Sequence, residues 1–309
     1  REGRRSSGKN LSATSPARCL SSPGCRATNL CEHPSWPPPL EKEAKVEEAL
    51  RTRQDRALPR RSEARVATVI PIFRASVTPR EALRVGQTLR NTPADQAYFV
   101  GPHGLDTRAF ESLWPSVAFV PFERSAFASQ MSYSNWMLRP ELYRHFLDYD
   151  FVLIAQTDAF LIEPLPIGID WGFDYVGAPW EPPWIKRWDS VENRVRSANR
   201  FRGKRLRVGN GGLSLRRTST FAEGLNFPDP LERTYEDIAI SFFHRRIGVK
   251  LAPVRIARRF FAEMGARRWT PGDAVPEVYG FHALDKFNPR LEDLLLYGTA
   301  SVTLPSASS

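Results

Sequence analysis

The segment FVLIAQTD (residues 151–158) decides the fold class of this chain. Its first five residues are apolar without alternation, which indicates a strand buried on both faces, as in parallel sheets. Polar residues follow at once, at the carboxyl end of that strand, where open α/β sheets bind their ligands. We therefore expect an α/β domain in which Gln156 and Asp158 lie at the binding edge.

The segments before this strand alternate as expected for a parallel sheet. Compact apolar runs predict strands at residues 65–72, 96–102 and 117–122. Helices are predicted at residues 78–91, 107–114 and 132–147. The first of them has the features of a capping box, with Thr78 as N-cap, Pro79 next and Glu81 in the third position. Pro140 must break the third helix or begin its second half. This order predicts right-handed βαβ units and an open, mostly parallel sheet flanked by helices.

The two ends of the chain differ in composition from this domain. Residues 1–60 are rich in Ser, Pro and Arg and are predicted to form a disordered, low-complexity tail. Within it, residues 41–57 predict a short charged helix with a thin apolar stripe. The α/β domain is expected over residues 61–300, and a second disordered segment over residues 301–309.

The cysteines and the hydropathy bear on the compartment. Cys19, Cys25 and Cys31 are evenly spaced near His33, but their odd number and the lack of a second ligand cluster disfavour a metal knuckle. The domain contains no cysteine and would tolerate a reducing compartment. No run of about 18 apolar residues and no apolar stretch near the start is present, so we expect a cytoplasmic protein without a transmembrane segment.

The charge of the chain is unevenly distributed. Of the formal net charge of +10, residues 1–65 carry 14 Lys/Arg against 8 Asp/Glu, whereas residues 66–309 carry 30 against 26. A nucleic-acid-binding domain would have the excess on its folded part, so we expect no nucleic-acid partner. Residues 186–207 have nine Lys/Arg against two acidic residues. This stretch predicts a loop that either covers a diphosphate, attracts an acidic acceptor or is simply solvated.

Three motifs in the second half offer binding groups. Asp158 would hold a divalent cation that neutralises a diphosphate, or would cap the next turn. Trp180 ends the sequence DYVGAPW and would stack on a sugar ring or pack in the core. Asn210, in VGNGGLSLR, lies among glycines whose backbone N–H groups suit a phosphate or a sugar hydroxyl. Asn-Gly is also a strong signal for a hairpin turn.

Two further motifs offer groups for proton transfer or metal binding. Glu236 and Asp237 begin an apolar helix, where the helix dipole alone favours acidic residues. If that helix points into the cleft, one of the two would deprotonate an acceptor hydroxyl. His282, in YGFHA, is a lone histidine that is either structural or an extra ligand of a metal bound by Asp158.

Taken in order, these motifs resemble the DUF5672 family, whose members are regarded as glycosyltransferase-like with a GT-A fold. The resemblance covers about residues 65–298. It rests on residues 156–160, 174–180, 208–216, 236–237, 259–263 and 280–282. Tyr133 and Asn135 also resemble a Tyr-Asn element of the family, although Ser134 separates them here.

The resemblance implies a GT-A-like, Rossmann-like sheet and a nucleotide-sugar donor, often with Mn²⁺ or Mg²⁺. It implies that Asp158 stands for the Asp-x-Asp element of GT-A enzymes, with Gln156 at the position of the first carboxylate. It also implies that His282 is the C-terminal metal ligand and that Asp237 or Glu236 is the catalytic base. The donor- and sugar-binding residues expected on this basis are Pro71, Gln156, Asp158, Trp180, Asn210, Gly211 and Gly212.

The function expected is therefore transfer of a sugar to a hydroxyl of a carbohydrate or other acceptor, as in polysaccharide biosynthesis. The missing first carboxylate leaves an alternative, a non-catalytic carbohydrate-binding module on a decayed transferase fold.

Overall fold

The structure is a computed structural model, and it describes residues 64–166, 172–180, 208–227 and 234–298. The chain divides into two units, Arg1–Pro38 and Pro39–Ser309, and every described residue belongs to the second. The predictions made for the N-terminal tail, the cysteines, the basic stretch 186–207 and residues 301–309 lie outside the described residues.

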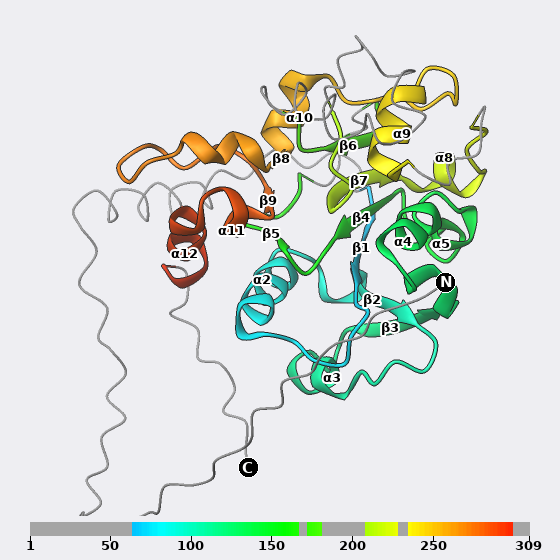
Figure 1. Ribbon diagram of the computed structural model, residues 1–309, viewed down its shortest axis with the longest axis horizontal. Helices are drawn as coiled ribbons and strands as arrows, with labels where there is room; N and C mark the ends of the chain where they lie inside the picture. Colours follow the sequence, from blue (N-terminus) through cyan, green and yellow to red (C-terminus); the bar gives the residue numbers. More distant parts are fainter. Residues whose placement is uncertain (1–63, 167–171, 181–207, 228–233, 299–309) are drawn as a thin grey trace, which may run out of the picture. The chain divides into compact units, whose positions relative to one another are not determined.

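A six-stranded sheet in the order β3-β2-β1-β4-β7-β6 forms the centre of the fold (Figure 1). Its strands are β1 (Val66–Pro71), β2 (Ala97–Pro102), β3 (Ala118–Phe122), β4 (Phe151–Ala155), β6 (Tyr175–Gly177) and β7 (Leu213–Arg217). The first four run parallel, and β7 is antiparallel to both of its neighbours. Every residue of β1 and β4 is buried, as their unbroken apolar sequence predicts. The expected mostly parallel α/β sheet is confirmed.

Helix boundaries in the first half follow local signals. Helix α2 (Pro79–Arg90) has the complete capping box, in which Thr78 and Glu81 bond reciprocally. The predicted third helix is two helices, α4 (Gln130–Trp136) and α5 (Pro140–Arg144), and Pro140 stands at the first position of the second. The other elements of this half are η1 (Ala94–Gln96), α3 (Arg108–Leu113) and η2 (Arg124–Phe127).

A second, three-stranded sheet has the order β5-β9-β8 and consists of β5 (Ala159–Leu161), β8 (Phe261–Ala262) and β9 (Gly280–His282). Strand β5 begins directly after the Gln-Thr-Asp turn, and its Ala159 pairs with His282 of β9. This pairing brings the C-terminal histidine motif to the carboxyl end of β4. The remaining elements are α8 (Thr218–Ala222), α9 (Glu236–Phe243), α10 (Val254–Phe260), η4 (Met264–Arg268), α11 (Leu284–Phe287) and α12 (Pro289–Tyr297).

Two clusters of buried apolar side chains hold these layers together. The larger surrounds the six-stranded sheet, and the smaller lies between the three-stranded sheet and α12. In Figure 1, α12 lies beside α2, and Arg80 of α2 donates to Asp293 of α12 at 2.7 Å. None of the helices in the described residues is both long and apolar enough to cross a lipid bilayer.

Candidate active site

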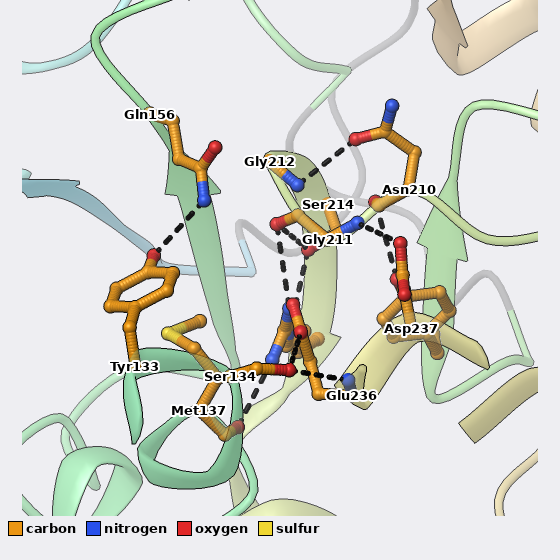
Figure 2. Close-up of polar contacts among 12 residues, drawn as sticks. Tyr133, Ser134, Met137, Gln156, Asn210, Gly211, Gly212, Ser214, Glu236 and Asp237 are labelled. Atoms are coloured by element: carbon orange, nitrogen blue, oxygen red, sulfur yellow. Dashed lines mark hydrogen bonds and ion pairs between the residues drawn. The ribbon is translucent and has the colours of Figure 1, made fainter. Parts of the chain in front are cut away.

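The turn after β4 is anchored on three sides. The backbone N–H of Gln156 donates to Gly212 O at 2.8 Å, and its side-chain amide donates to the hydroxyl of Tyr133 at 3.4 Å (Figure 2). Thr157 Oγ1 donates to Glu81 Oε1 at 3.0 Å, so the glutamate of the α2 capping box also holds the turn. Asp158, the last residue of the triplet, keeps a partly exposed carboxylate at this edge.

The glycine-rich loop before β7 is shaped by Asn210. This buried residue has a left-handed backbone (φ 61°), and its Oδ1 accepts from the N–H groups of Gly212 at 2.9 Å and Leu213 at 3.3 Å. The loop is not a two-residue hairpin, because β7 pairs with β6 and β4, and Val208 bridges Pro179. Asn210 therefore stabilises the loop, and its Oδ1 is already engaged.

The glycines of this loop are required by close neighbours. A side chain at Gly212 would collide with the imidazole of His282, and one at Gly211 would collide with the carboxylate of Glu236. At Gly209 the collision would be with the indole of Trp180. The motif thus brings the backbone against three of the predicted site residues rather than only permitting a turn.

His282 contacts carboxylates with both ring nitrogens. Its Nδ1 lies 2.9 Å from Glu263 Oε1, and its Nε2 lies 3.2 Å from Asp158 Oδ1. Asn210 Nδ2 is also 2.8 Å from Nδ1, a contact that is a hydrogen bond only when Nδ1 carries no proton. Burial alone would lower the pKa of His282, but the hydrogen bonds and charges of Asp158 and Glu263 raise it to about 9.

The same contacts act on Asp158. Burial opposes its ionisation, but the hydrogen bond and charge of His282, together with Lys286, hold the pKa of Asp158 well below its usual range. Lys286 Nζ lies 3.1 Å from Asp158 Oδ2. Asp158 is therefore an anion between two cationic groups.

The pair Asp158 and His282 fits a divalent cation. The buried Nε2 of His282 faces the Asp158 carboxylate, 3.2 Å from its Oδ1. Glu263 at the other ring nitrogen is the kind of carboxylate that orients a metal-ligating histidine. The described residues contain no group of three or more His, Cys, Asp or Glu side chains that could hold a metal. Phosphate oxygens and water are further ligands that a hard divalent cation at this pair would accept.

The two carboxylates at the start of α9 have different surroundings. Glu236 is buried, and its oxygens accept from Ser134 Oγ at 2.5 Å and Arg216 Nη2 at 3.4 Å. Asp237 accepts from the backbone N–H of Gly211 at 3.3 Å and of Ile238 at 2.8 Å. Burial, and then the charge of Glu236, raise the pKa of Asp237 to about 7. The pKa of Asp237 is thereby brought close to neutral pH.

The structure brings most of the predicted residues together. Direct contacts join Asp158 to His282 and His282 to Asn210, while Gly211 connects that loop to Asp237. Trp180 is half-buried and packs over Gly209. Pro71 is buried at the end of β1, where it stands opposite Val100 of β2. Which of them bind a donor or a sugar stays a prediction.

Several residues at the site were not predicted from the sequence. Glu263, Ser134 and Arg216 lie in or beside the motifs of the family resemblance, but their sequence predicts no role for them, and Lys286 lies outside those motifs. Arg74 pairs with Glu81, which links the loop after β1 to the Gln-Thr-Asp turn. Partners that lie between 19 and 128 positions apart, such as Glu263 with His282 and Lys286 with Asp158, follow no local pattern.

Comparisons with known proteins bear on the family and the fold of this chain. The family model described as "Protein of unknown function (DUF5672)" matches residues 116–282. Among solved structures, an active-site mutant of LgtC superposes with a TM-score of 0.50 at 15% identity and covers 78% of this chain and 98% of its own. This similarity supports the GT-A fold and, at that identity, the fold alone.

Two further similar structures have lower scores. The galactosyltransferase LgtC, in complex with donor and acceptor sugar analogs, has a TM-score of 0.49 at 14% identity and covers 77% of this chain and 97% of its own. The mannosyltransferase PcManGT from Pyrobaculum calidifontis, in complex with GDP-Man and Mn²⁺, has a TM-score of 0.41 at 13% identity, with coverages of 80% and 66%. A comparison with curated protein sequences found no match.

Proposed function

Because the chain belongs to the DUF5672 family and has a GT-A fold, we propose that it is a glycosyltransferase that moves a sugar from a nucleotide-sugar donor to an acceptor hydroxyl. One observation carries this proposal. Asp158, His282 and Asp237, which belong to three separate segments, meet around the Asn210–Gly212 loop at the carboxyl end of β4. That edge is where α/β sheets of this kind bind ligands.

The donor's diphosphate is assigned to the side of the site with Asp158. Asp158 and His282 would hold Mn²⁺ or Mg²⁺, which supplies positive charge to a leaving diphosphate. Lys286, whose side chain is 62% exposed, adds a second cationic group that a phosphate can reach. In the loop after β1, Arg74 and the exposed Phe73 offer a cation and an aromatic face at the same edge.

The acceptor is assigned to the side with Asp237. A general base works best when its pKa lies near the operating pH, and the pKa of Asp237 is raised to about 7. Its carboxylate takes the proton of the attacking hydroxyl, while the glycine-rich loop beside it holds the backbone in place. Glu236 is unsuited to this role, because both of its oxygens are engaged by Ser134 and Arg216.

The test is a donor screen on the full chain with nucleotide sugars, with and without Mn²⁺. We expect one nucleotide sugar to raise the melting temperature in a metal-dependent manner and to release its nucleoside diphosphate in the presence of an acceptor. Asp158→Asn should abolish the metal-dependent shift. Asp237→Asn should keep the shift and lower turnover by about 100- to 10,000-fold.

The control is Asp106→Asn, which removes an exposed pair with Arg108 and should change neither property. If no nucleotide sugar binds or is turned over, the proposal fails. Saccharide binding without any turnover would instead favour the non-catalytic carbohydrate-binding module.

A further inference from the structure

Arg216, in β7, is a fully buried arginine whose five N–H donors all have acceptors. Nε donates to Ser214 Oγ at 3.0 Å, and Nη1 donates to Met137 O at 3.1 Å and Tyr143 Oη at 2.8 Å. Nη2 donates to Gly211 O and to Glu236 Oε1, each at 3.4 Å. A guanidinium has five donors in a fixed planar arrangement, so this side chain determines the relative positions of several segments at once.

The segments that Arg216 joins are the ones that carry the proposed acceptor side of the site. Tyr143 belongs to α5 and Met137 to the turn before it. Gly211 belongs to the glycine-rich loop, and Glu236 to the first turn of α9. Figure 2 shows the contacts of Gly211, Glu236 and Ser134 in this group. None of the contacts to Arg216 is made by Asp237 itself, although Asp237 follows Glu236 directly in the chain.

Ser134 completes the attachment of α9. Its hydroxyl donates to Glu236 Oε2 at 2.5 Å and accepts from the Glu236 backbone N–H at 2.6 Å, so it serves as a cap provided by another helix. Both backbone polar groups of Gly211 are engaged: its carbonyl accepts from Arg216, and its N–H donates to Asp237 at 3.3 Å. Glu236 and Gly211 thus fix Asp237 from two directions.

We propose that Arg216 is a positioning residue for the transfer reaction: by holding Gly211 and Glu236 together, it fixes the Asp237 carboxylate against the loop that carries Asn210. Glu236 then acts as a fixed negative charge beside Asp237 and not as the base itself. This inference rests on the proposed function, in which Asp237 receives the proton of the acceptor hydroxyl.

The electrostatic surroundings of Asp237 agree with this arrangement. The groups that face Asp237 are Glu236 on its own helix, the Gly211 N–H, Glu263 after β8, Tyr175 on β6 and, through Glu236, Arg216 on β7. Burial comes first and the charge of Glu236 second among the causes that raise the pKa of Asp237 to about 7. Arg216 and Ser134 donate hydrogen bonds to the buried carboxylate of Glu236.

The experiment uses Arg216→Lys and Glu236→Gln, with Arg217→Lys as the matched control. Arg217 is the next residue on the same strand and pairs with Asp174 at 2.9 Å, away from Asp237. Lysine keeps the charge at position 216 but provides three donors in place of five. For Arg216→Lys we expect kcat to fall about tenfold or more with the donor KM within about twofold, and Arg217→Lys to match the wild type.

Glu236→Gln removes the charge and keeps the size of the side chain. We expect the titration midpoint of the Asp237 carboxyl, followed by ¹³C NMR in protein with labelled aspartate and assigned with Asp237→Asn, to fall by about one unit or more. The acidic limb of the turnover profile should move by the same amount. A residue with only a structural role would scale turnover uniformly with pH and would leave the midpoint unchanged.

The NMR titration requires no turnover, so it separates this inference from the proposed function. If no donor is turned over but the midpoint falls in Glu236→Gln, the proposed function fails while the link between Glu236 and Asp237 holds. If the midpoint does not move in Glu236→Gln, or if Arg216→Lys has the kcat of Arg217→Lys, the inference is wrong.

Discussion

Two buried arginine–carboxylate groups, one on β7 and one on α2, differ in how their polar atoms are matched. Arg216 makes one ion pair, with Glu236, and gives its other donors to neutral oxygens. Arg84 of α2 instead lies between two carboxylates, Glu292 of α12 at 2.7 Å and Asp285 of α11 at 3.1 Å.

The acceptors of the second group are only partly satisfied. In the described residues, Glu292 Oε2 and Asp285 Oδ1 are buried without a hydrogen-bond partner. Burial raises the pKa of Glu292 despite the opposing charge of Arg84. A matched network specifies geometry, whereas a partly matched ionic cluster mainly joins elements and has a desolvation cost. The first group lies at the candidate site, and the second attaches the C-terminal helices to α2.

The largest effect should come from breaking the matched network. Arg216→Met leaves Glu236 charged, buried and without its partner, so we expect the free energy of unfolding to fall by about 3–5 kcal/mol. Urea denaturation followed by circular dichroism measures this change. Arg217→Met serves as the control and should lose less, because Arg217 is partly exposed. Equal losses for the two variants would contradict the distinction.

The Arg84 group should respond differently to removal of both charges. Arg84→Leu alone should lower the free energy of unfolding by about 3 kcal/mol, because buried Glu292 keeps only its longer pair with Arg80, at 3.4 Å. The double variant with Glu292→Leu should recover to within about 1 kcal/mol of the wild type, since apolar replacement of a buried ion pair is often neutral. A double-mutant cycle by urea denaturation measures the coupling, and additive losses would show that the pair is not a unit.

The glycine-rich loop beside Arg216 allows a smaller test. At Gly212 an added methyl group would meet the His282 ring, so Gly212→Ala should destabilise by about 1–3 kcal/mol. Gly86 is the control, because in the middle of α2 its added methyl group has only the end of Arg90 nearby. Gly86→Ala should stabilise by about 0.5–1 kcal/mol. Changes of the same sign in thermal melting would rule out this reading of the loop.

A last test is the dependence of stability on pH. The pKa of Asp237 is raised to about 7 in the folded protein, from an ordinary value near 4 in the unfolded chain. The folded state therefore retains the proton longer, and stability falls as pH rises from about 4 to about 7. Asp237→Asn removes this penalty, so its melting temperature relative to wild type should be higher at pH 8 than at pH 5. A difference that does not change with pH would contradict the raised pKa.

Much of the fold was predictable because its signals are local. The strands around the site are continuous apolar runs, and α2 carries its complete capping box at Thr78 and Glu81. Strands β5, β8 and β9 were not predicted, because two or three residues show no period. The pairing of β5 with β9 joins residues more than 100 positions apart, such as Ala159 and His282, and β8 in turn pairs with β9.

The sequence indicated which residues gather at the candidate site, but not which hydrogen bonds and ion pairs connect them. Motif order pointed to Asp158, Asn210, Asp237 and His282, and the structure brings them together. The sequence does not decide whether Glu236 or Asp237 is the base. That decision depends on the hydrogen bonds of Ser134 and Arg216 to Glu236, and no local sequence pattern predicts contacts between residues so far apart in the chain. Charges that are matched only after folding leave no local pattern to read.

The left-handed Asn210 also has a consequence for the chemical ageing of this protein. An asparagine followed by glycine is open to deamidation, in which the next backbone nitrogen attacks the side-chain carbonyl and ammonia leaves. Here the Gly211 backbone N–H donates a hydrogen bond to Asp237. The side-chain carbonyl of Asn210 accepts from the backbone N–H groups of Gly212 and Leu213. The fold holds both reactants apart in fixed hydrogen bonds. The amount of isoaspartate at Asn210–Gly211 in a sample would therefore increase with the time that this loop has spent unfolded.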